Sequence, residues 1–401
     1  MKKNLLFVMP SLSAGGGERS LVNLLSQINY QLYNVDLFLF HHEGIFMEYV
    51  PKEVRILPIQ EKYQTFTLPL FQSIKTFVSN AEISLAYNRF LFFIKNRMGG
   101  NISKREQYNW KYVAQSLNQI EKQYDVAIGF LEKTSTYFCV DKVKAHKKIG
   151  WVHIDYNKLG MDPDFDALYF GKLDNIVTVS EECANVLVNK FPNKQSEINV
   201  IYNIVSPTMI HKMANQENKD VYCRKDNEII ILSIGRLHYQ KGFEMAIQSC
   251  KELVDKGYKI RWNIIGEGTE REKLSDLIKI NRLEGNITLL GLKSNPYPYI
   301  KQADIYVQPS RFEGKSIAID EAKILNKPIL VTNFSTAKDQ IENEVNGLIV
   351  GMNSESIANG IEKLIKDIEL KNKLVNNLTN ESLGTEEEID KLYEMLKDGS
   401  L

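Results

Sequence analysis

Short apolar runs alternate with longer amphipathic stretches along nearly the whole chain of 401 residues. This alternation is typical of strands buried beneath helices on both faces, and therefore of parallel sheets in an α/β protein. The length is about two or three times that of a usual domain, so we expect two domains. Each half contains enough apolar runs to build one doubly wound, Rossmann-like domain.

The predicted strands of the two halves are Asn4 to Met9, Asn34 to Phe40, Tyr124 to Phe130, Lys148 to Val152, Asn175 to Val179, Ile198 to Ile201, Glu228 to Ile234, Ile260 to Ile265, Ile287 to Leu290, Asp304 to Val307, Pro328 to Val331 and Gly347 to Val350. Pro207 and a polar run at residues 215–220 interrupt the periodicity between Asn203 and Cys223. We therefore expect an N-terminal domain over residues 1–205 and a C-terminal domain over residues 206–385. Residues 386–401 are predicted to be a helix and tail, and the helix is expected to pack back on the first domain.

Charge and composition exclude several classes of protein. Lys plus Arg and Asp plus Glu each total 50, so no overall positive field exists to hold nucleic acid. With 43% hydrophobic and 25% charged residues, the composition is that of a soluble globular protein. The four cysteines lack the paired spacing of a zinc or redox site, and we expect reduced core thiols: Cys139, Cys183, Cys223 and Cys250.

The apolar run Leu5 to Met9 near the N-terminus stops at Pro10, which is too early for a secretory signal. No run approaches the roughly 20 apolar residues that span a bilayer. We expect a cytoplasmic protein, with contact to the inner face of the plasma membrane as an open alternative.

An aromatic-rich insertion around residues 63–112 departs from the plain alternation. Between Phe71 and Tyr112 seven bases face only two acids, Glu82 and Glu106. A basic, aromatic surface of this kind suits an anionic membrane. A pair of core helices with a solvated basic face explains the same composition, and the sequence leaves both interpretations open.

Three glycines, Gly15 to Gly17, follow the first strand and open an amphipathic helix. Glycine lets the backbone approach a ligand, and free amides at a helix N-terminus favour an anion such as phosphate. A tight turn also needs glycine for its geometry alone. The run has neither the GxGxxG spacing nor the Lys-Ser/Thr of a P-loop, so it predicts neither NAD nor ATP binding.

The second domain opens with two cations at the end of its first strand. Arg236 follows that strand, and Lys241 comes five residues later at a helix start. Ligands of open α/β sheets bind at this carboxyl edge, and two cations there suit a diphosphate. A charged loop without a ligand is the alternative. Gly266 ends the next strand and either contacts the ligand or only makes the turn.

The most specific segment is residues 309–322, which follow the strand Asp304 to Val307. Glu313 precedes a predicted helix, and Glu321 lies about two turns within it. The backbone amides at the helix start would donate to an oxyanion, and the two carboxylates would accept from hydroxyls. A solvated helix face is the alternative for this glutamate pair.

Several motifs occur in a fixed order along the chain. They are Pro-Ser-Leu and Gly-Gly-Gly-Glu-Arg near the N-terminus, Gly-Arg-Leu and Lys-Gly at residues 235–242, Ala-Asp-Ile-Tyr-Val-Gln-Pro-Ser, Phe-Glu-Gly with Glu-Ala following, Lys-Pro-Ile-Leu-Val-Thr and Asn-Gly-Leu-Ile-Val. Together they resemble the retaining glycosyltransferases of family 4, also called glycosyl transferases group 1. The resemblance covers almost the whole chain, is strongest from Ile229 to Val350 and is weakest in the insertion.

The resemblance implies the GT-B fold, in which two Rossmann-like domains face a central cleft and the second holds a nucleotide sugar. It implies catalytic roles for Glu313, Arg236, Lys241 and His153. The donor-binding residues that it implies are Gly16, Gly17, Arg236, Lys241, Gly266, Glu313, Gly314, Lys315, Ser316, Ile317 and Glu321. Within this set Glu321 would hold the ribose. Lys315 departs from the bulky apolar residue that the family more often has there, and would face phosphate or acceptor.

The resemblance further implies transfer of a UDP-linked hexose or N-acetylhexosamine, with retention, to a saccharide acceptor. The acceptor would be lipid-linked, for example to undecaprenol, in bacterial capsule or exopolysaccharide synthesis. No DxD metal motif is evident in the region where the resemblance would place it, so no metal and no cofactor are expected. Two alternatives are an epimerase or hydrolase of nucleotide sugars on the same fold, and a non-catalytic partner subunit of a glycosyltransferase.

Overall fold

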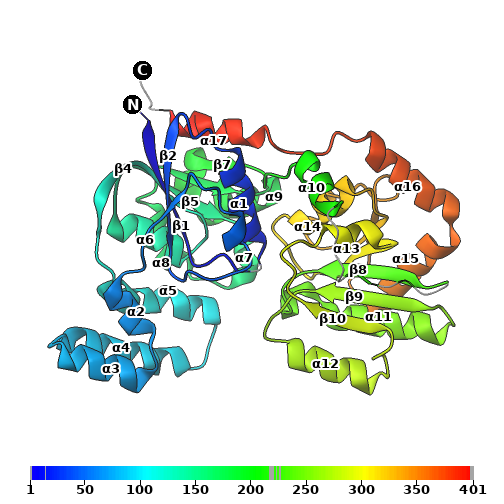
Figure 1. Ribbon diagram of the computed structural model, residues 1–401, viewed down its shortest axis with the longest axis horizontal. Helices are drawn as coiled ribbons and strands as arrows, with labels where there is room; N and C mark the ends of the chain where they lie inside the picture. The colour runs from blue at the N-terminus through cyan, green and yellow to red at the C-terminus, as the bar shows by residue number, and fades with distance from the viewer. Residues whose placement is uncertain (1, 14, 216–220, 223, 225–226, 398–401) are drawn as a thin grey trace. The chain divides into compact units, whose positions relative to one another are not determined.

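The computed structural model describes residues 2–13, 15–215, 221–222, 224 and 227–397. The chain divides into two compact units, each built on one parallel sheet (Figure 1). Unit 1 comprises residues 1–13, 24–201 and 389–401, and unit 2 comprises residues 14–23 and 202–388. The prediction of two Rossmann-like domains is confirmed by these sheets.

The sheet of unit 1 has seven strands in the order β3-β2-β1-β4-β5-β6-β7. These strands are β1 (Lys3–Met9), β2 (Tyr33–Leu39), β3 (Arg55–Ile56), β4 (Ile120–Gly129), β5 (Val143–Val152), β6 (Asn175–Thr178) and β7 (Ile198–Val200). Residues 5–9 of β1 are fully buried, as expected of a strand covered on both faces. All six strands predicted in this half are present. The sequence does not predict β3, because two residues are too short to show a period.

Helices cover this sheet and also form the insertion between β3 and β4. The insertion contains α2 (Glu61–Thr67), α3 (Leu70–Ser79), α4 (Ile83–Arg97) and α5 (Ile102–Val113). The other helices that lie wholly or partly in unit 1 are α1 (Gly16–Gln27), α6 (Thr134–Lys142), α7 (Tyr156–Leu159), α8 (Pro163–Phe170), α9 (Glu181–Lys190) and α17 (Glu388–Leu396). The insertion has a small apolar core of its own around Phe66 and Phe77. In Figure 1 its helices α3 and α4 lie beside each other, away from the strands of this unit.

The C-terminal helix α17 packs on unit 1, as predicted. Lys3 Nζ donates to the Leu396 carbonyl at 2.8 Å. The ring of Tyr393 stacks on Tyr33 with 5.4 Å between the centroids, and its hydroxyl donates to the Gln27 carbonyl. These contacts join the end of the chain to β1, β2 and α1.

Unit 2 has a six-stranded parallel sheet in the order β10-β9-β8-β11-β12-β13. Its strands are β8 (Ile229–Ile234), β9 (Ile260–Ile265), β10 (Ile287–Gly291), β11 (Ile305–Gln308), β12 (Ile329–Thr332) and β13 (Leu348–Val350). Its helices are α10 (Pro207–Ala214), α11 (Phe243–Asp255), α12 (Arg271–Ile280), α13 (Tyr297–Gln302), α14 (Ile317–Ile324), α15 (Ser354–Lys366) and α16 (Ile368–Asn380). Ile231 packs with α11 and α15, whereas Ile230 and Leu232 pack with α13 and α14. The sheet therefore lies between two layers of helices, and all six predicted strands are present.

The division of the chain differs from the predicted domain limits in its first residues. Residues 14–23, which the sequence assigns to the N-terminal domain, group with unit 2. Ser20 Oγ donates to Asn203 Oδ1 at 2.7 Å, and Asn23 Nδ2 donates to the Ile204 carbonyl at 2.9 Å. The first turns of α1 are thus bonded to the chain that opens unit 2.

Three of the four cysteines, Cys139, Cys183 and Cys250, are buried and form no disulfide among the described residues, and Cys223 lies outside those residues. Burial raises the pKa of the Cys250 thiol to about 12. No helix in the described part of the chain is both long enough and apolar enough to span a bilayer.

Candidate functional site

The loops after β8 and β9 meet at the carboxyl edge of the sheet in unit 2. The Gly235 amide donates to the Ile265 carbonyl at 3.0 Å, and the Leu237 amide donates to the Glu267 carbonyl at 2.9 Å. Gly266 has a φ of +149°, and a Cβ there would lie 1.9 Å from the Gly235 carbonyl oxygen. Only glycine fits at this position, so Gly266 supports the backbone on either side of Arg236.

A second pair of loops, after β8 and β11, is joined by the side chain and backbone of Gln240. The Arg311 amide donates to the Gln240 carbonyl at 2.7 Å, and Gln240 Nε2 donates to the Phe312 carbonyl at 2.9 Å. Gly242 has a φ of +64°, and a Cβ there would lie 2.2 Å from the Pro309 carbonyl oxygen. These contacts bring Lys241 and Glu313 together.

The Glu313 carboxylate is buried, and protein donors hold one of its two oxygens firmly. Its Oε1 accepts from Lys241 Nζ at 2.5 Å, Ser310 Oγ at 2.6 Å and Gln308 Nε2 at 3.0 Å. Its Oε2 accepts one long hydrogen bond, from Gln240 Nε2 at 3.4 Å. One oxygen is therefore fixed by protein donors, and the other keeps capacity to accept from a hydroxyl group.

Arg236, the other predicted cation, is exposed and forms no ion pair with the described residues. Lys241 differs, because Glu313 already neutralises it. At the start of α14 the amides of Gly314, Lys315 and Ile317 donate to none of the described acceptors. The edge thus offers a guanidinium and free backbone donors, which together favour an anion.

The Ser316 amide is not among these free donors. It donates to Gln340 Oε1 at 2.8 Å, and Gln340 Nε2 donates back to the Ser316 carbonyl at 2.9 Å. This reciprocal pair fixes the start of α14. Lys315 lies over the ring of Tyr202, with its Nζ 3.9 Å from the centroid. This cation–π contact gives the unusual Lys315 a partner within unit 2.

Glu321, the second predicted glutamate, is buried and already bound by other side chains. Its carboxylate is fully buried, and Arg19 Nη1 lies 2.6 Å from both of its oxygens. Tyr297 donates its hydroxyl to Oε1 at 3.0 Å. Burial raises the pKa of Glu321, and the charge of Arg19 opposes that rise. The resemblance predicts that the Glu321 carboxylate binds the ribose, whereas in this structure it binds the guanidinium of Arg19.

The glycine-rich run, Gly15 to Gly17, lies just before Arg19 in the sequence. Gly16 begins α1, and a Cβ there would meet no heavy atom within 4 Å. The Arg19 amide donates to the Gly15 carbonyl at 3.1 Å. Gly16 and Gly17 group with unit 2, together with the Glu321 that Arg19 binds.

In unit 1, the predicted histidine follows β5. The ring of His153 packs against Phe130 and Trp151, and its Nε2 is buried with no hydrogen-bond partner in the described structure. Burial lowers the pKa of His153 to about 3, so the ring is neutral near pH 7. Its backbone amide donates to Glu132 Oε2 at 3.2 Å. An orphan ring nitrogen of this kind is suited to a hydrogen bond with a ligand.

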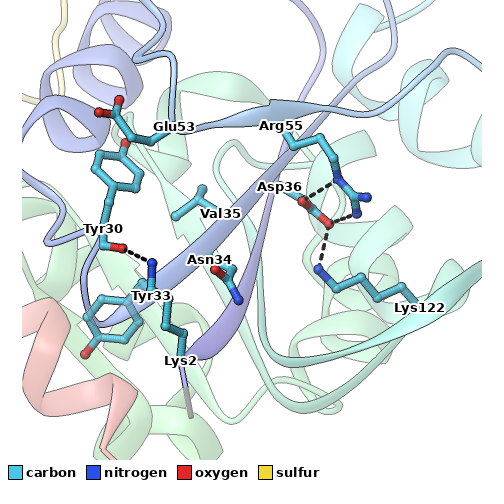
Figure 2. Close-up of a pocket in the computed structure, with 9 residues that line it drawn as sticks. All are labelled: Lys2, Tyr30, Tyr33, Asn34, Val35, Asp36, Glu53, Arg55 and Lys122. Atoms are coloured by element: carbon cyan, nitrogen blue, oxygen red, sulfur yellow. Dashed lines mark hydrogen bonds and ion pairs between the residues drawn. The ribbon is translucent and has the colours of Figure 1, made fainter.

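A pocket of about 450 Å³ lies elsewhere in unit 1, near the amino ends of β1, β2 and β3 (Figure 2). Asp36 at its wall accepts from Arg55, Lys122 and Tyr124, at distances of 2.6 to 3.1 Å. Ligands of open α/β sheets bind at the carboxyl edge instead. Because its central carboxylate is already satisfied, we do not assign this pocket to the site.

Sequence reasoning missed several residues that the structure brings to these sites. Gln308 and Ser310 hold Glu313, Arg19 holds Glu321, and Glu132 accepts from the His153 amide. Gln308, Ser310 and Arg19 stand inside the ordered motifs of the chain, so those motifs carried a signal. Glu132 stands in none of them. The predicted residues of the C-terminal domain are brought together, and His153 lies in the other unit.

Comparison with known proteins shows which family the C-terminal half of the chain resembles. Residues 214–381 match the family model described as glycosyl transferases group 1. The chain is 27% identical over 210 residues to the capsular polysaccharide glycosyltransferase CapM of Staphylococcus aureus, covering 51% of this chain and 55% of CapM. It is also 27% identical over 212 residues to a Campylobacter jejuni N-acetylgalactosaminyltransferase, covering 52% of this chain and 56% of that protein. The chain spans about half the length of these curated relatives.

Solved structures match over nearly the full length. A glycosyltransferase from Rickettsia africae has a TM-score of 0.68 at 18% identity and covers 99% of this chain and 98% of its own. HepE of Anabaena, solved with UDP and glucose, has a TM-score of 0.68 at 15% identity and covers 98% and 99%. The protein therefore has the GT-B fold. Its residues 214–381 match the glycosyl transferases group 1 model, and the narrower assignment to family 4 stays a prediction.

Proposed function

We propose that this protein transfers a sugar from a UDP-sugar to a saccharide acceptor and retains the anomeric configuration. The observation that carries this proposal is the open Oε2 of Glu313 beside cations and free amides in the group 1 domain. A carboxylate that can accept from sugar hydroxyls, next to donors for an anion, suits a nucleotide sugar. UDP is favoured because HepE was solved with UDP and with UDP-glucose.

In the proposed reaction the bond from the anomeric carbon to the diphosphate oxygen breaks, and a bond to the acceptor oxygen forms. The acceptor hydroxyl gives its proton to the departing phosphate, so UDP leaves as a free nucleotide. Arg236 and Lys241 would stabilise the negative charge that grows on the leaving group. Glu313 would position the sugar through its Oε2. The hexose or N-acetylhexosamine identity of that sugar is part of the proposal.

Two side chains limit how the donor enters. Lys241 Nζ lies 2.5 Å from Glu313 Oε1 before any ligand binds. Lys241 must therefore share its charge between Glu313 and the diphosphate. Ribose binding at Glu321 requires displacement of Arg19, or else the ribose binds another group.

We propose that the neutral His153 forms a hydrogen bond with a sugar hydroxyl through its Nε2.

The acceptor is proposed to be a lipid-linked saccharide in the synthesis of a bacterial surface polysaccharide. CapM acts in capsular polysaccharide biosynthesis, and the Campylobacter relative transfers N-acetylgalactosamine to a saccharide linked to diphospho-undecaprenol. We also propose that transfer needs no metal, because Arg236, Lys241 and the α14 amides supply the positive charge that a metal would bring.

The test is a radiolabelled UDP-glucose and UDP-N-acetylglucosamine assay with purified protein, with and without a lipid-linked saccharide and with and without EDTA. Arg236→Ala is expected to lower turnover by roughly 10² to 10³-fold, because one preorganised donor to the developing charge is lost. Lys373→Ala, at an exposed lysine of α16, serves as the control and should turn over normally. Wild-type turnover by Arg236→Ala would refute the assignment.

The same assay separates the two alternatives. Release of free sugar or of its epimer without acceptor would indicate a hydrolase or an epimerase. Calorimetry that detects no UDP binding by the wild-type protein, together with no turnover, would indicate a non-catalytic partner subunit. Loss of transfer on adding EDTA would contradict only the proposal that transfer needs no metal.

A further inference from the structure

The helix α4 in the insertion has two apolar faces. Leu85 and Ala86 are buried in the small core of the insertion. A second set of large apolar residues, spaced 4, 3 and 4 apart, lies on one other face and is exposed: Ile83, Tyr87, Phe90 and Ile94. Ile83 is 60% exposed and Tyr87 is 62% exposed. A surface helix normally has polar residues on this face, so the stripe needs a partner to cover it.

The neighbouring helix α3 repeats the feature. Phe71 is 86% exposed, and Val78 lies seven residues later on the same face and is exposed as well. Lys75 lies between them on that face, because residues four and seven apart share one side of a helix. The two helices lie side by side (Figure 1). Ile74 and Phe77 of α3 share the small apolar core of the insertion with Leu85 of α4.

The concentration of exposed apolar residues is particular to this part of the chain. Nine of the 17 exposed large hydrophobic side chains of the described residues fall between residues 71 and 108. The interpretation as core helices with only a solvated basic face is therefore insufficient. A face with this many exposed apolar groups marks an interaction surface.

The charges on α3 and α4 indicate which kind of partner this surface binds. Lys75 and Lys95 have no carboxylate within ion-pair distance in the described structure, and Arg97 lies over the ring of Phe93 at 4.1 Å. The two acids are already paired: Glu82 with Lys62 at 2.6 Å, and Glu106 with Lys133. The surface is therefore positive, which disfavours a second copy of the same surface and favours an anionic partner.

We propose that the exposed faces of α3 and α4 dock on an anionic phospholipid bilayer. Exposed aromatic and aliphatic side chains enter the boundary between headgroups and acyl chains, and Lys75, Lys95 and Arg97 pair with lipid phosphates. A helix with an apolar stripe beside basic residues lies in the plane of such an interface. The fifteen residues of α4 span about 22 Å along that plane. The proposal does not rest on the proposed function, because binding to a bilayer requires no turnover.

The experiment is flotation of the full chain with vesicles of phosphatidylcholine alone or mixed with phosphatidylglycerol. We expect flotation with the mixed vesicles and release by added salt, because salt screens the contribution of the bases. The double variant Lys75→Gln/Lys95→Gln should partition roughly 25-fold less, since each base near an anionic surface is worth about fivefold in partition. Phe71→Ser/Phe90→Ser should partition at least roughly tenfold less.

A matched control for the apolar variant places the same kind of change elsewhere in the chain. Leu168→Ser/Ile280→Ser removes two other exposed apolar side chains, which are 64% and 78% exposed, and should float like the wild type. Circular dichroism verifies that each variant is folded. Absence of wild-type flotation at low salt overturns the proposal, as does an equal loss of flotation in the Leu168→Ser/Ile280→Ser control. Dimerisation that depends on Phe71 and Phe90, without flotation, would assign the surface to a second copy instead.

Discussion

The carboxyl edges of the two sheets carry side chains of different kinds. In unit 2 the edge is ionic: Lys241 pairs with Glu313, Arg19 pairs with Glu321, and Arg236 stays unpaired among the described residues. In unit 1 the corresponding edge carries a neutral ring, because burial lowers the pKa of His153 to about 3. Beside it, burial raises the pKa of the Glu132 carboxyl above its usual range.

Both sheets are parallel and doubly wound, so the topology alone does not create this difference. It comes from the residues that follow each strand, which is why a fold by itself does not determine a function. An ionic edge suits a diphosphate, and a neutral edge with an orphan ring nitrogen suits the hydroxyls of a sugar.

The largest effect is expected for Arg19→Met, which leaves the Glu321 carboxylate buried without its counter-charge. We expect the free energy of unfolding to fall by about 3–5 kcal/mol, the usual cost of removing one partner of a buried pair. Without Arg19 the pKa of Glu321 rises further in the folded state. Folding then requires a proton that the unfolded chain has lost, so the loss of stability grows as the pH rises. Urea unfolding at about pH 5 and about pH 8 measures both effects.

Arg55→Met is the matched control for that variant, since Arg55 also binds a carboxylate, that of Asp36, in unit 1. Arg55 is largely exposed, and Lys122 and Tyr124 continue to hold Asp36. Its loss should cost about 1 kcal/mol or less. Equal, small losses in the two variants would contradict the view that the Glu321 pair is a sealed part of the ionic edge.

A smaller effect is expected for Gly266→Ala. The new Cβ would lie 1.9 Å from the Gly235 carbonyl oxygen, at a φ of +149°. We expect a loss of about 1–3 kcal/mol in unfolding free energy and weaker UDP binding, because the backbone around Arg236 must shift. Gly285→Ala is the control, since nothing lies within 4 Å of its added Cβ. Thermal unfolding with and without UDP measures both, and unchanged UDP binding would show that the turn does not support the site.

The sequence predicts the strands well because a strand buried on both faces is a continuous apolar run. It also locates the loops of unit 2, since Arg236, Lys241 and Glu313 follow such runs directly. It cannot show that Arg19 binds Glu321, because the two residues are 302 positions apart and only the tertiary fold joins them. The exposed stripe of α4 was readable as a 4, 3, 4 spacing, but the sequence cannot say which of two apolar faces is covered.

The effect that is smallest near neutral pH concerns the neutral edge of unit 1. Because burial lowers the pKa of His153 to about 3, the unfolded chain binds a proton at His153 near pH 6 that the folded chain does not. Stability should therefore fall as the pH drops from about 6.5 towards 3, and His153→Gln should weaken that dependence. Proton NMR of the folded protein should show the His153 ring neutral at about pH 5 and titrating at about pH 6.5 in urea. A folded-state pKa near 6.5 would instead make the edge cationic at mildly acidic pH and remove the contrast between the two sheets.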